Sequence, residues 1–359
     1  MVIDKNDYFL MGTVNLWILA GHRKLDDSKV PLTNLKNKGI NFLHDFITQI
    51  DFHEKSVKTK LHEKIEYDYL IIALGVDFAI ERIKGFTENG GFNLYDANQI
   101  PKLREQILSL KKGRIAVCIT DTPYKCPPAP YEASLIIDDI LTKNGTRDSI
   151  DIDIYTPTPI ALPVAGPKIS QDIVSLLDAH EINLHLVHKL KTVSNDNEGE
   201  FLNGNKMRYD ILIGIPPHII PIKAEDSPGL LKEGENWITV NSSNLRTSYE
   251  NVFAVGDVTE IKISENLAIP KAGIFAEAEA KAVSQQIIDD IRGNNIDSEN
   301  SRFDGKGYCF LEIGNNKAGY LAADFYNVSG PTTKLEPPNE TSYLKKIEFE
   351  RSRTAEWLL

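Results

Sequence analysis

The stretch TPYKCPPAPYE, residues 122–132, constrains the fold of this chain more than any other segment. It follows an apolar run over 114–119 that predicts a β-strand, and it leads into a helical pattern over 130–143. A strand, a tight turn and a helix form the nucleotide-binding unit of a doubly wound α/β fold, whose turn is normally rich in glycine so that the backbone can approach a pyrophosphate. This turn has no glycine, and Cys126 is followed by three prolines that remove amide donors. The sequence therefore predicts a rigid turn that holds a thiol where a phosphate would otherwise bind.

The environment of Cys126 allows two interpretations. The N-terminus of the following helix carries positive potential, which favours a reactive thiolate. The alternative is a small buried residue beside a rigid turn, which is the usual situation of a single cysteine. Both interpretations stay open at this point.

Composition excludes several classes of protein. The 359-residue chain has room for two or three domains, and its net charge of −11 argues against a nucleic-acid partner. Apolar runs such as residues 69–73 are too short to cross a bilayer, so we expect a cytoplasmic protein or one bound peripherally to a membrane. Three cysteines are too few for a secreted disulfide scaffold, but they leave room for one redox pair.

Strand and helix patterns alternate through the middle of the chain. Strand 114–119 and helix 130–143 are followed by strand 151–155, helix 166–180 and strand 182–187. Such alternation is typical of a parallel sheet covered by helices. The sequence therefore predicts an α/β fold.

The first residues contain a strand that closes on an acid, Asp4. In a dinucleotide-binding domain such an acid follows the second strand, about 20 residues after the glycine-rich turn, and binds the adenosine ribose. No such turn precedes it here. Either the first strand, turn and helix of the domain are missing, which we favour, or Asp4 is an ordinary acid at the end of a strand.

Two further strands lead into glycine. Residues 69–75 predict a buried strand that ends at Gly75, and residues 251–257 predict one that ends on Gly256 and Asp257. Glycine lets the backbone pass close to a ligand, and an Asp at the carboxyl end of a strand can bind a sugar hydroxyl. For the first strand the alternative is an ordinary core strand and turn.

A long helix is predicted over 274–291, and Pro270, Lys271 and Gly273 precede it. The amide groups at the N-terminus of such a helix present positive potential to an electron-rich ring or a phosphate. We therefore expect the segment from Asp257 to this helix to contact a ligand.

The last part of the chain changes character. Glycine-bounded strands over 307–313 and 319–325 predict a small antiparallel layer that carries Cys309. Prolines at 337–338 are expected to separate this layer from a charged helix over 340–357. The end of that helix either dips into a membrane interface or packs on the body of the protein.

Several motifs resemble a known family. YDYLIIALG, NVFAVGD and PKAGIFAEAEA resemble the flavin-binding segments of the two-dinucleotide-domain flavoproteins. KCPPAPYEAS and GYCFLEIG are narrower and resemble the sulfide:quinone oxidoreductases and the flavoprotein subunit of flavocytochrome c sulfide dehydrogenase. The resemblance covers nearly the whole chain. It implies two Rossmann-like domains, the first of them incomplete, a small C-terminal α+β domain, and FAD as cofactor.

The resemblance also implies domain boundaries and roles. The expected domains are an FAD-binding domain over 1–97 and 210–294, a second Rossmann-like domain over 98–209, and a C-terminal domain over 295–359. The residues implied at the cofactor are Asp4 at the ribose, Gly75, Gly256, Asp257, Pro270, Lys271 and Gly273. The implied redox pair is Cys126 and Cys309, with Glu132 as the acid–base group; an alternative role for Glu132 is to stabilise the helix dipole.

The chain departs from the family at two places. The family's opening strand and GxGxxG turn, about 30 residues, have no counterpart before Asp4, so we expect FAD to bind weakly or not at all. The third cysteine of some quinone-reducing members has no match except Cys118, which we interpret as a core residue. We interpret His218 as a loop histidine without a function.

The resemblance implies a reaction. Hydrosulfide attacks a Cys126–Cys309 disulfide and gives a persulfide and a thiolate, and two electrons then enter FAD. The final acceptor is a quinone, or a haem protein as in the flavocytochrome c enzymes. Two other functions are an NAD(P)H dehydrogenase, disfavoured by the turn without glycine, and a non-catalytic remnant without flavin. A homo-oligomer is also compatible with the sequence.

Overall fold

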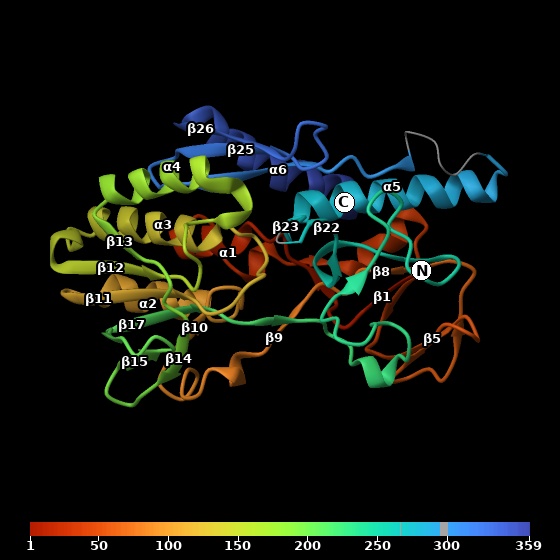
Figure 1. Cartoon of the computed structure of the whole chain (residues 1–359), viewed down its shortest axis with the longest axis horizontal. Coiled ribbons are helices and arrows are strands. Elements are labelled where there is room, and N and C mark those ends of the chain that lie inside the picture. The colour runs from red at the N-terminus through yellow and green to blue at the C-terminus, as the bar shows by residue number, and fades with distance from the viewer. Residues whose placement is uncertain (266, 295–300) are drawn as a thin grey trace.

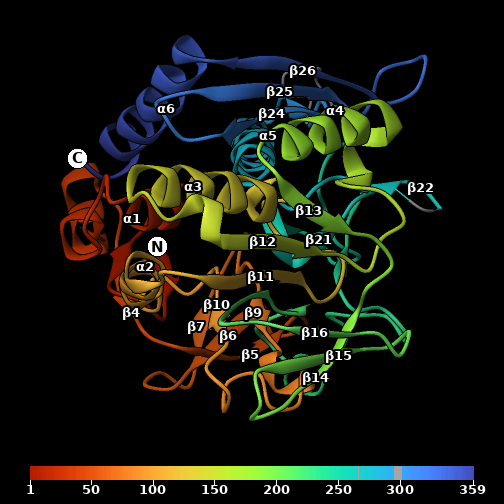
Figure 2. The same ribbon diagram turned by 90° about the vertical axis from the view of Figure 1, so that its left-hand side faces the viewer.

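The computed structural model describes residues 1–265, 267–294 and 301–359. One half of the molecule contains a parallel five-stranded sheet in the order β10-β17-β11-β12-β13. Helices α3 and α4 lie between this sheet and a C-terminal β-layer, as Figure 2 shows. The strands are β10 (Phe92–Asn93), β11 (Gly113–Ile119), β12 (Ile150–Tyr155), β13 (Ile182–His185) and β17 (Ile211–Ile215), and the helices are α3 (Ala129–Lys143) and α4 (Gly166–Ala179).

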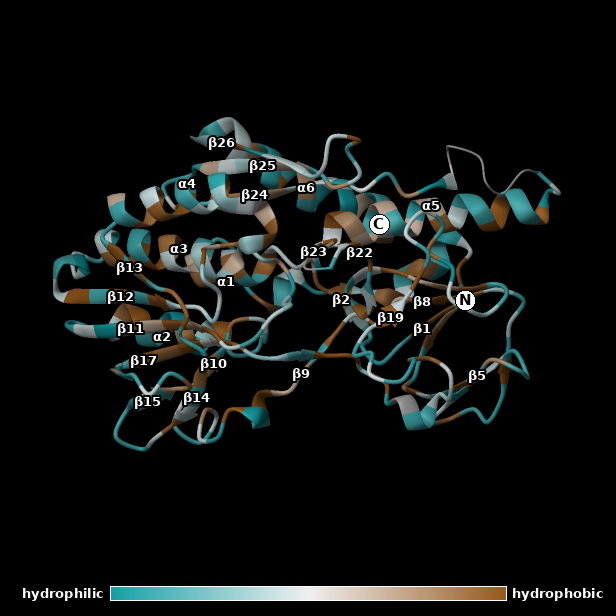
Figure 3. Cartoon of the chain, viewed as in Figure 1, coloured by the Kyte–Doolittle hydropathy of each residue, from teal (hydrophilic) through white to brown (hydrophobic). Residues whose placement is uncertain are grey.

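The parallel sheet is built around two neighbouring strands, β11 and β17, that are mostly apolar on both faces. Residues 115–119 of β11 are completely buried, and so is most of β17. Parallel strands need cover on both sides, and the brown colour of the inner strands in Figure 3 reflects this. The α/β fold expected from the sequence is confirmed.

Helix α3 is buried around almost its whole circumference. It packs on β11 and β12 with one side and on strand β24 (Lys306–Glu312) of the C-terminal layer with another. Tyr131, Glu132 and Ser134 are each 0–2% exposed. The site residues at the start of α3 are therefore held between two layers.

Two helices pack beside α3. Helix α1 (Val14–Ala20) contacts α3 and α2 (Ile100–Ser109), and Trp17 in α1 is 1% exposed. The sequence reasoning did not predict α1. The apolar run VNLWILAG carries a recognisable end signal, because Gly21 closes the helix in the left-handed conformation with φ +85°.

The other half contains the segments expected to bind FAD. Two parallel pairs lie there, β1 (Val2–Asp4) with β4 (Phe42–His44) and β8 (Leu70–Ile72) with β20 (Val252–Ala254), beside helix α5 (Gly273–Ile291). Strand β8 was expected to be buried, but Ile71 is 40% exposed. The reason is that β8 pairs only with β20 among the described strands, and the face that carries Ile71 is left uncovered.

Short strands complete the two halves. An antiparallel sheet β5-β6-β7 and a sheet β14-β15-β16 lie at the periphery. The bounds are β2 (Tyr8–Phe9), β3 (Val30–Pro31), β5 (Ile47–Asp51), β6 (Ser56–Thr59), β7 (Ile65–Glu66), β9 (Asp77–Phe78), β14 (Leu190–Val193), β15 (Glu198–Phe201), β16 (Lys206–Arg208), β18 (His218–Ile219), β19 (Ile238–Thr239), β21 (Thr259–Glu260), β22 (Lys262–Ser264) and β23 (Leu267–Ala268).

The pairing of β10 and β17 bears on the domain boundaries. We expected residues 92–93 and 211–215 in the FAD-binding domain, but both strands hydrogen-bond within the sheet of the second domain. We propose to move the boundaries to about residue 91 and residue 216, outside these strands. The proposed C-terminal domain keeps its bounds of 295–359, and its first six residues, 295–300, lie outside the described part of the chain.

The C-terminal layer is a three-stranded antiparallel sheet, β24-β25-β26, followed by a helix. Strands β25 (Ala318–Asp324) and β26 (Thr332–Asn339) lead directly into α6 (Glu340–Leu358). We expected the prolines at 337–338 to separate the β-layer from the helix, but they belong to β26. This is possible because β26 is an edge strand, where a missing amide donor interrupts no ladder.

The end of α6 packs on the body of the protein. The Trp357 and Phe9 rings meet edge to face with centroids 6.0 Å apart, and Leu358 is 4% exposed against Leu32 and Leu35. Of the two alternatives for these residues, the structure shows packing. None of the helices in the described ranges is both long enough and apolar enough to span a bilayer.

Candidate functional site

The turn that carries Cys126 is held by several hydrogen bonds. Cys126 has φ +48°, a conformation that a residue with a side chain rarely adopts, and its amide donates to the Lys271 carbonyl over 2.6 Å. Its own carbonyl accepts from the Ala129 amide at the start of α3 over 2.8 Å, and Tyr95 Oη donates to the Lys125 carbonyl over 2.5 Å. The turn is therefore fixed to both halves of the molecule.

Cys309 in β24 supplies a second half-buried thiol in the same region. The charge on the Cys309 sulfur raises the pKa of Cys126, and the carboxylate of Glu132 raises the pKa of both thiols. Both cysteines are free thiols in the structure. The structure thus brings Cys309 into the same electrostatic environment as Cys126 and Glu132, which lie far from it in the sequence.

Of the two interpretations of Cys126, the structure favours the buried residue over the stabilised thiolate. Burial, the neighbouring Cys309 and the Glu132 carboxylate raise the pKa of Cys126 well above its ordinary value, although Lys346 opposes them. Burial and Glu132 also raise the pKa of Cys309, to about 12. Desolvation and a nearby carboxylate outweigh the field of the α3 N-terminus. At neutral pH both groups are therefore thiols unless a base takes the proton.

A cavity of about 30 Å³ lies beside Cys309. A water molecule needs about 10–15 Å³ measured in this way, so the cavity admits a guest of one or two heavy atoms. Its walls are mostly apolar and come from the turn, the start of α5 and the C-terminal layer. They include Pro127, Pro128, Pro270, Phe275, Tyr308 and Cys309.

Glu132 lies in a buried ion triad. Lys346 Nζ, from α6, donates to Glu132 Oε1 and to Glu312 Oε2, the latter over 2.7 Å. Trp17 Nε1 donates to Glu312 Oε2 over 2.9 Å, and the Glu312 amide donates to Glu132 Oε1 over 3.2 Å. The three charged residues are each 1–2% exposed. The sequence reasoning found Glu132 but missed Glu312 and Lys346.

The segment from Gly256 to Gly273 forms a second cluster that touches the first through the Cys126–Lys271 hydrogen bond. Burial raises the pKa of Asp257, and burial lowers the pKa of Lys271 to about 8. The Lys271 ammonium donates to the carbonyls of Asp257 and Thr259, each over 2.7 Å. The sequence reasoning missed Glu279, whose Oε2 accepts from the Gly256 amide over 2.5 Å.

The flavin end of an FAD molecule fits the features of this segment. Helix α5 begins without a side-chain cap, so its first amide groups are available to an acceptor. A Cβ atom placed on Gly75 or on Gly273 would meet nothing within 4 Å, so both glycines border open space. Pro270 stands just before this helix and also lines the cavity beside Cys309. These residues therefore fit the group that the sequence implies.

Asp4 and Gly75 lie apart from the cysteine cluster, and no hydrogen bond between described residues links them to it. Asp4 closes β1, and its Oδ1 accepts from the Asn6 amide over 2.7 Å. Gly75 follows β8 with φ +65°, which favours glycine. Their roles at the cofactor stay predictions.

We interpreted His218 as a loop residue, but it lies in the short strand β18. Its ring is 7% exposed and packs edge-on against Phe78 and Tyr95 at centroid distances of 5.1 and 5.4 Å. Its Nδ1 lies 2.8 Å from the Pro216 carbonyl, and burial lowers its pKa to about 4. The ring is therefore neutral at physiological pH.

Cys118 is a core residue, as the sequence predicted. It is completely buried in β11, and its Sγ lies 3.8 Å from Met207 Sδ. We expect Cys118→Ala to lower the free energy of unfolding by about 1 kcal/mol, because it removes one buried atom from a packed sheet. Chemical denaturation measures this change. A loss of function without a loss of stability would contradict the assignment.

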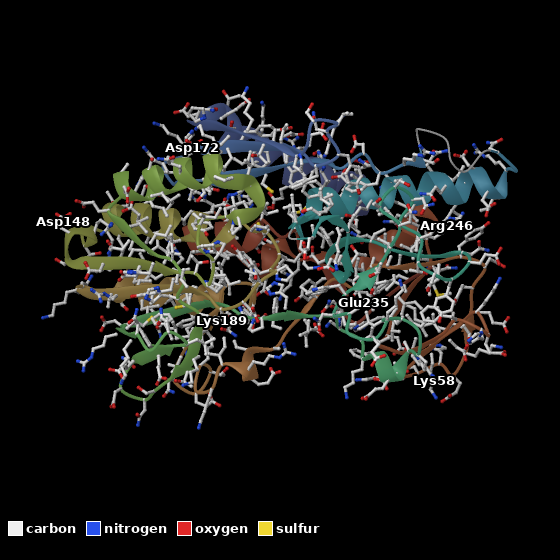
Figure 4. The ribbon with its side chains drawn as sticks, in the orientation of Figure 1. Lys58, Asp148, Asp172, Lys189, Glu235 and Arg246 are labelled. Carbon is white, nitrogen blue, oxygen red and sulfur yellow. The ribbon has the colours of Figure 1, made fainter. Side chains whose placement is uncertain are left out.

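The turn after β11 is unsuited to a dinucleotide phosphate. Asp121 places a carboxylate there, and it pairs with Lys189, labelled in Figure 4, over 2.7 Å. A carboxylate repels phosphate, and the prolines after Cys126 remove amide donors. The second domain therefore has the topology of a dinucleotide-binding domain without its phosphate-binding turn.

This fold defines a class of protein: an α/β protein with Rossmann-type domains and a small C-terminal layer. The crystal structure of the sulfide:quinone oxidoreductase from the hyperthermophilic bacterium Aquifex aeolicus superposes on it with a TM-score of 0.86 at 24% sequence identity, covering 99% of this chain and 84% of that one. A structure of NDH2 from Plasmodium falciparum in complex with NADH superposes with a TM-score of 0.70 at 16% identity, covering 99% of this chain and 89% of that one.

The sequences narrow the comparison to a family. The mitochondrial sulfide:quinone oxidoreductase of Dictyostelium discoideum is 30% identical over 267 residues, and the match covers 70% of this chain and 58% of that relative. The sulfide-quinone reductase of Aquifex aeolicus is 29% identical over 337 residues, and this match covers 90% of this chain and 77% of that relative. The chain thus resembles the sulfide:quinone oxidoreductases over most of its length. No protein-family profile matches it.

Proposed function

We propose that this chain oxidises sulfide through Cys126 and Cys309 and passes the electrons to a quinone. The observation that carries the proposal is that Cys309 lines a small apolar cavity together with Pro127 and Pro128, the residues directly after Cys126, and that the charges of Cys309 and of the buried Glu132 both act on the pKa of Cys126. The names of the relatives supply the substrate and the acceptor. The chain spans 58% of the length of the first relative, so its activity rests on this proposal.

Each group has a role in this proposal. Hydrosulfide, which has one heavy atom, enters the cavity of about 30 Å³ and attacks the oxidised cysteine pair, giving a persulfide on one sulfur and a thiolate on the other. Glu132 exchanges the proton. FAD, when bound, supplies a two-electron acceptor. The residues that would hold it are Asp4, Gly75, Gly256, Asp257, Pro270, Lys271 and Gly273.

The acceptor and the membrane contact also belong to the proposal. A quinone is apolar, so its use implies that the protein works at a membrane surface. Leu344 in α6 and Leu359, which directly follows this helix, are 62% and 71% exposed and could make such a contact. A haem protein as acceptor remains the alternative from the flavocytochrome c enzymes.

We expect sulfide, but not NADH, to reduce the flavin of the protein incubated with FAD. The cysteine pair can receive electrons from sulfur, whereas the turn after β11 lacks the glycines and amide donors that would bind the phosphates of NADH. Loss of the oxidised flavin absorbance under anaerobic conditions measures both reactions. Comparable rates with NADH would instead favour an NAD(P)H dehydrogenase, and a protein that never acquires a flavin spectrum would favour a non-catalytic remnant.

A further inference from the structure

The buried triad of Glu132, Lys346 and Glu312 joins elements from three parts of the chain. Glu132 begins α3, Glu312 ends β24 three residues after Cys309, and Lys346 lies in α6. Each is 1–2% exposed. Buried charges are costly unless they are paired and hydrogen-bonded, so a cluster of three in one core calls for an explanation.

The triad has one carboxylate more than it has cations. Lys346 donates to one oxygen of each carboxylate, and Glu312 Oε1 is buried without a hydrogen-bond partner in the described part of the chain. Burial lowers the pKa of the Lys346 ammonium, but the charges of Glu132 and Glu312 and the hydrogen bonds to both carboxylates outweigh burial and raise this pKa above its ordinary value, so the ammonium keeps its charge. An unpaired oxygen on a buried carboxylate is costly unless the cluster can take up a further proton.

We propose that Lys346 and Glu312 are positioning residues that make Glu132 an exchangeable base for the thiols of Cys309 and Cys126, an inference that rests on the proposed sulfide chemistry. Lys346 keeps Glu132 ionised, so that it can accept a proton. Glu312 binds the same Lys346 ammonium. Its negative charge therefore keeps the ammonium from stabilising the ionised form of Glu132 too strongly. Two carboxylates on one lysine thus give a base of intermediate strength.

The proton transfer is balanced. The S–H bond of Cys309 breaks, an O–H bond forms on Glu132, and the negative charge moves from the carboxylate to the sulfur while no electron changes hands. The total charge of the buried cluster stays the same, so no second uncompensated charge arises. Since an ionised Glu132 raises the pKa of both thiols, a thiolate is stabilised when Glu132 has taken up the proton.

The two partners of Glu132 act on it in opposite directions. Burial raises the pKa of Glu132 most, Lys346 lowers it, and the charge of Glu312 raises it. Two other titratable groups face Glu312, namely His22, which follows α1, and Tyr343 in α6, whose Oη lies 3.3 Å from His22 Nδ1. Trp17 donates from α1 but does not titrate. These groups stay the same in all the variants below.

Infrared difference spectroscopy of the purified chain tests the proposal without sulfide or flavin. The spectrum of the unmodified chain minus that of Glu132→Gln isolates the C=O band of the protonated Glu132 carboxyl, and its pH titration gives a midpoint. We expect Glu312→Gln to move this midpoint to lower pH by about 1 unit or more, and Lys346→Met to move it to higher pH by a similar amount, as charges in contact do. Lys346→Arg should restore the original midpoint.

Two matched variants control for the charge change. Lys345→Met removes the neighbouring lysine on the exposed face of α6, and Glu348→Gln neutralises an exposed carboxylate of the same helix. Both should leave the midpoint unchanged. If Lys346→Met does not fold, Glu312→Gln decides alone, because an amide of the same shape can keep the hydrogen bond from Trp17. A midpoint that Glu312→Gln leaves in place, or moves upward, overturns the proposal.

A second measurement separates this inference from the proposed function. In the protein incubated with FAD, the acidic limb of the pH profile of sulfide-dependent flavin reduction should move in the same directions as the infrared midpoints. Shifted infrared midpoints without any reduction by sulfide would support the triad and overturn only the proposed activity. If sulfide reduces the flavin of Glu312→Gln and the acidic limb of the pH profile stays unchanged, the proposed role of the triad is overturned. The proposed activity would still stand.

Discussion

Cys126→Ala and Cys309→Ala should each abolish nearly all sulfide-dependent flavin reduction. The proposed reaction needs a disulfide for hydrosulfide to attack, and either substitution leaves a single sulfur that cannot form one. A thiol of raised pKa is also a poor nucleophile, so the remaining cysteine has no route of its own. The measurement is the loss of flavin absorbance on adding sulfide under anaerobic conditions.

The same variants need a control for folding. Both thiols are half-buried, and replacing either by alanine should cost about 1 kcal/mol of stability, comparable to Cys118→Ala in the core of β11. Cys118→Ala therefore serves as the matched variant, since it removes a sulfur of the same protein at equal structural cost. Sulfide reduction that survives in either single variant would show that the reaction does not use the pair.

Local patterns in the sequence predicted the second domain well. The strand 114–119, the turn without glycine and the following helix all appear where the period and the turn residues placed them, because each is determined by residues close together in the chain. Cys126 and Cys309 could be paired only through the resemblance to a family. Their 183-residue separation carries no signal of its own in a single sequence.

The predictions that failed depended on packing between distant segments. The interpretation of Cys126 as a thiolate followed from the helix dipole, a local property, but burial and the charges of Cys309 and Glu132 raise the pKa of Cys126 and favour the other interpretation. Glu312 and Lys346 were missed because each looks like an ordinary charged residue, and only the fold brings Lys346 to a glutamate 214 positions away. A glutamate in the apolar strand GYCFLE was the one available signal.

Glu279→Gln should stabilise the protein at neutral and alkaline pH. Glu279 is 2% exposed in α5, and its carboxylate accepts from the Gly256 amide. Burial is the main reason that its pKa rises from 4.5 to about 7, and the charge of Asp257 adds to it while Lys271 and the Gly256 hydrogen bond oppose it. The folded protein therefore binds a proton between these two pH values that the unfolded chain releases.

The sign of the pH dependence follows from this difference. The contribution of protonated Glu279 is fully present below pH 4.5 and is lost as the pH rises to about 7, a loss of about 3 kcal/mol in the free energy of unfolding. Glutamine stays neutral and can still accept the Gly256 hydrogen bond, so the variant should match the unmodified chain at acidic pH and exceed its stability by about 3 kcal/mol above pH 7.

Chemical denaturation at a series of pH values measures this difference, with Glu250→Gln as the control because its carboxylate is exposed. The control should follow the unmodified chain at every pH. If the free energy of unfolding of Glu279→Gln also follows that of the unmodified chain at every pH, Glu279 is already ionised in the folded protein at acidic pH. In that case the segment between Gly256 and Lys271 would carry a permanent negative charge, and it would be a poorer site for the electron-rich end of a flavin.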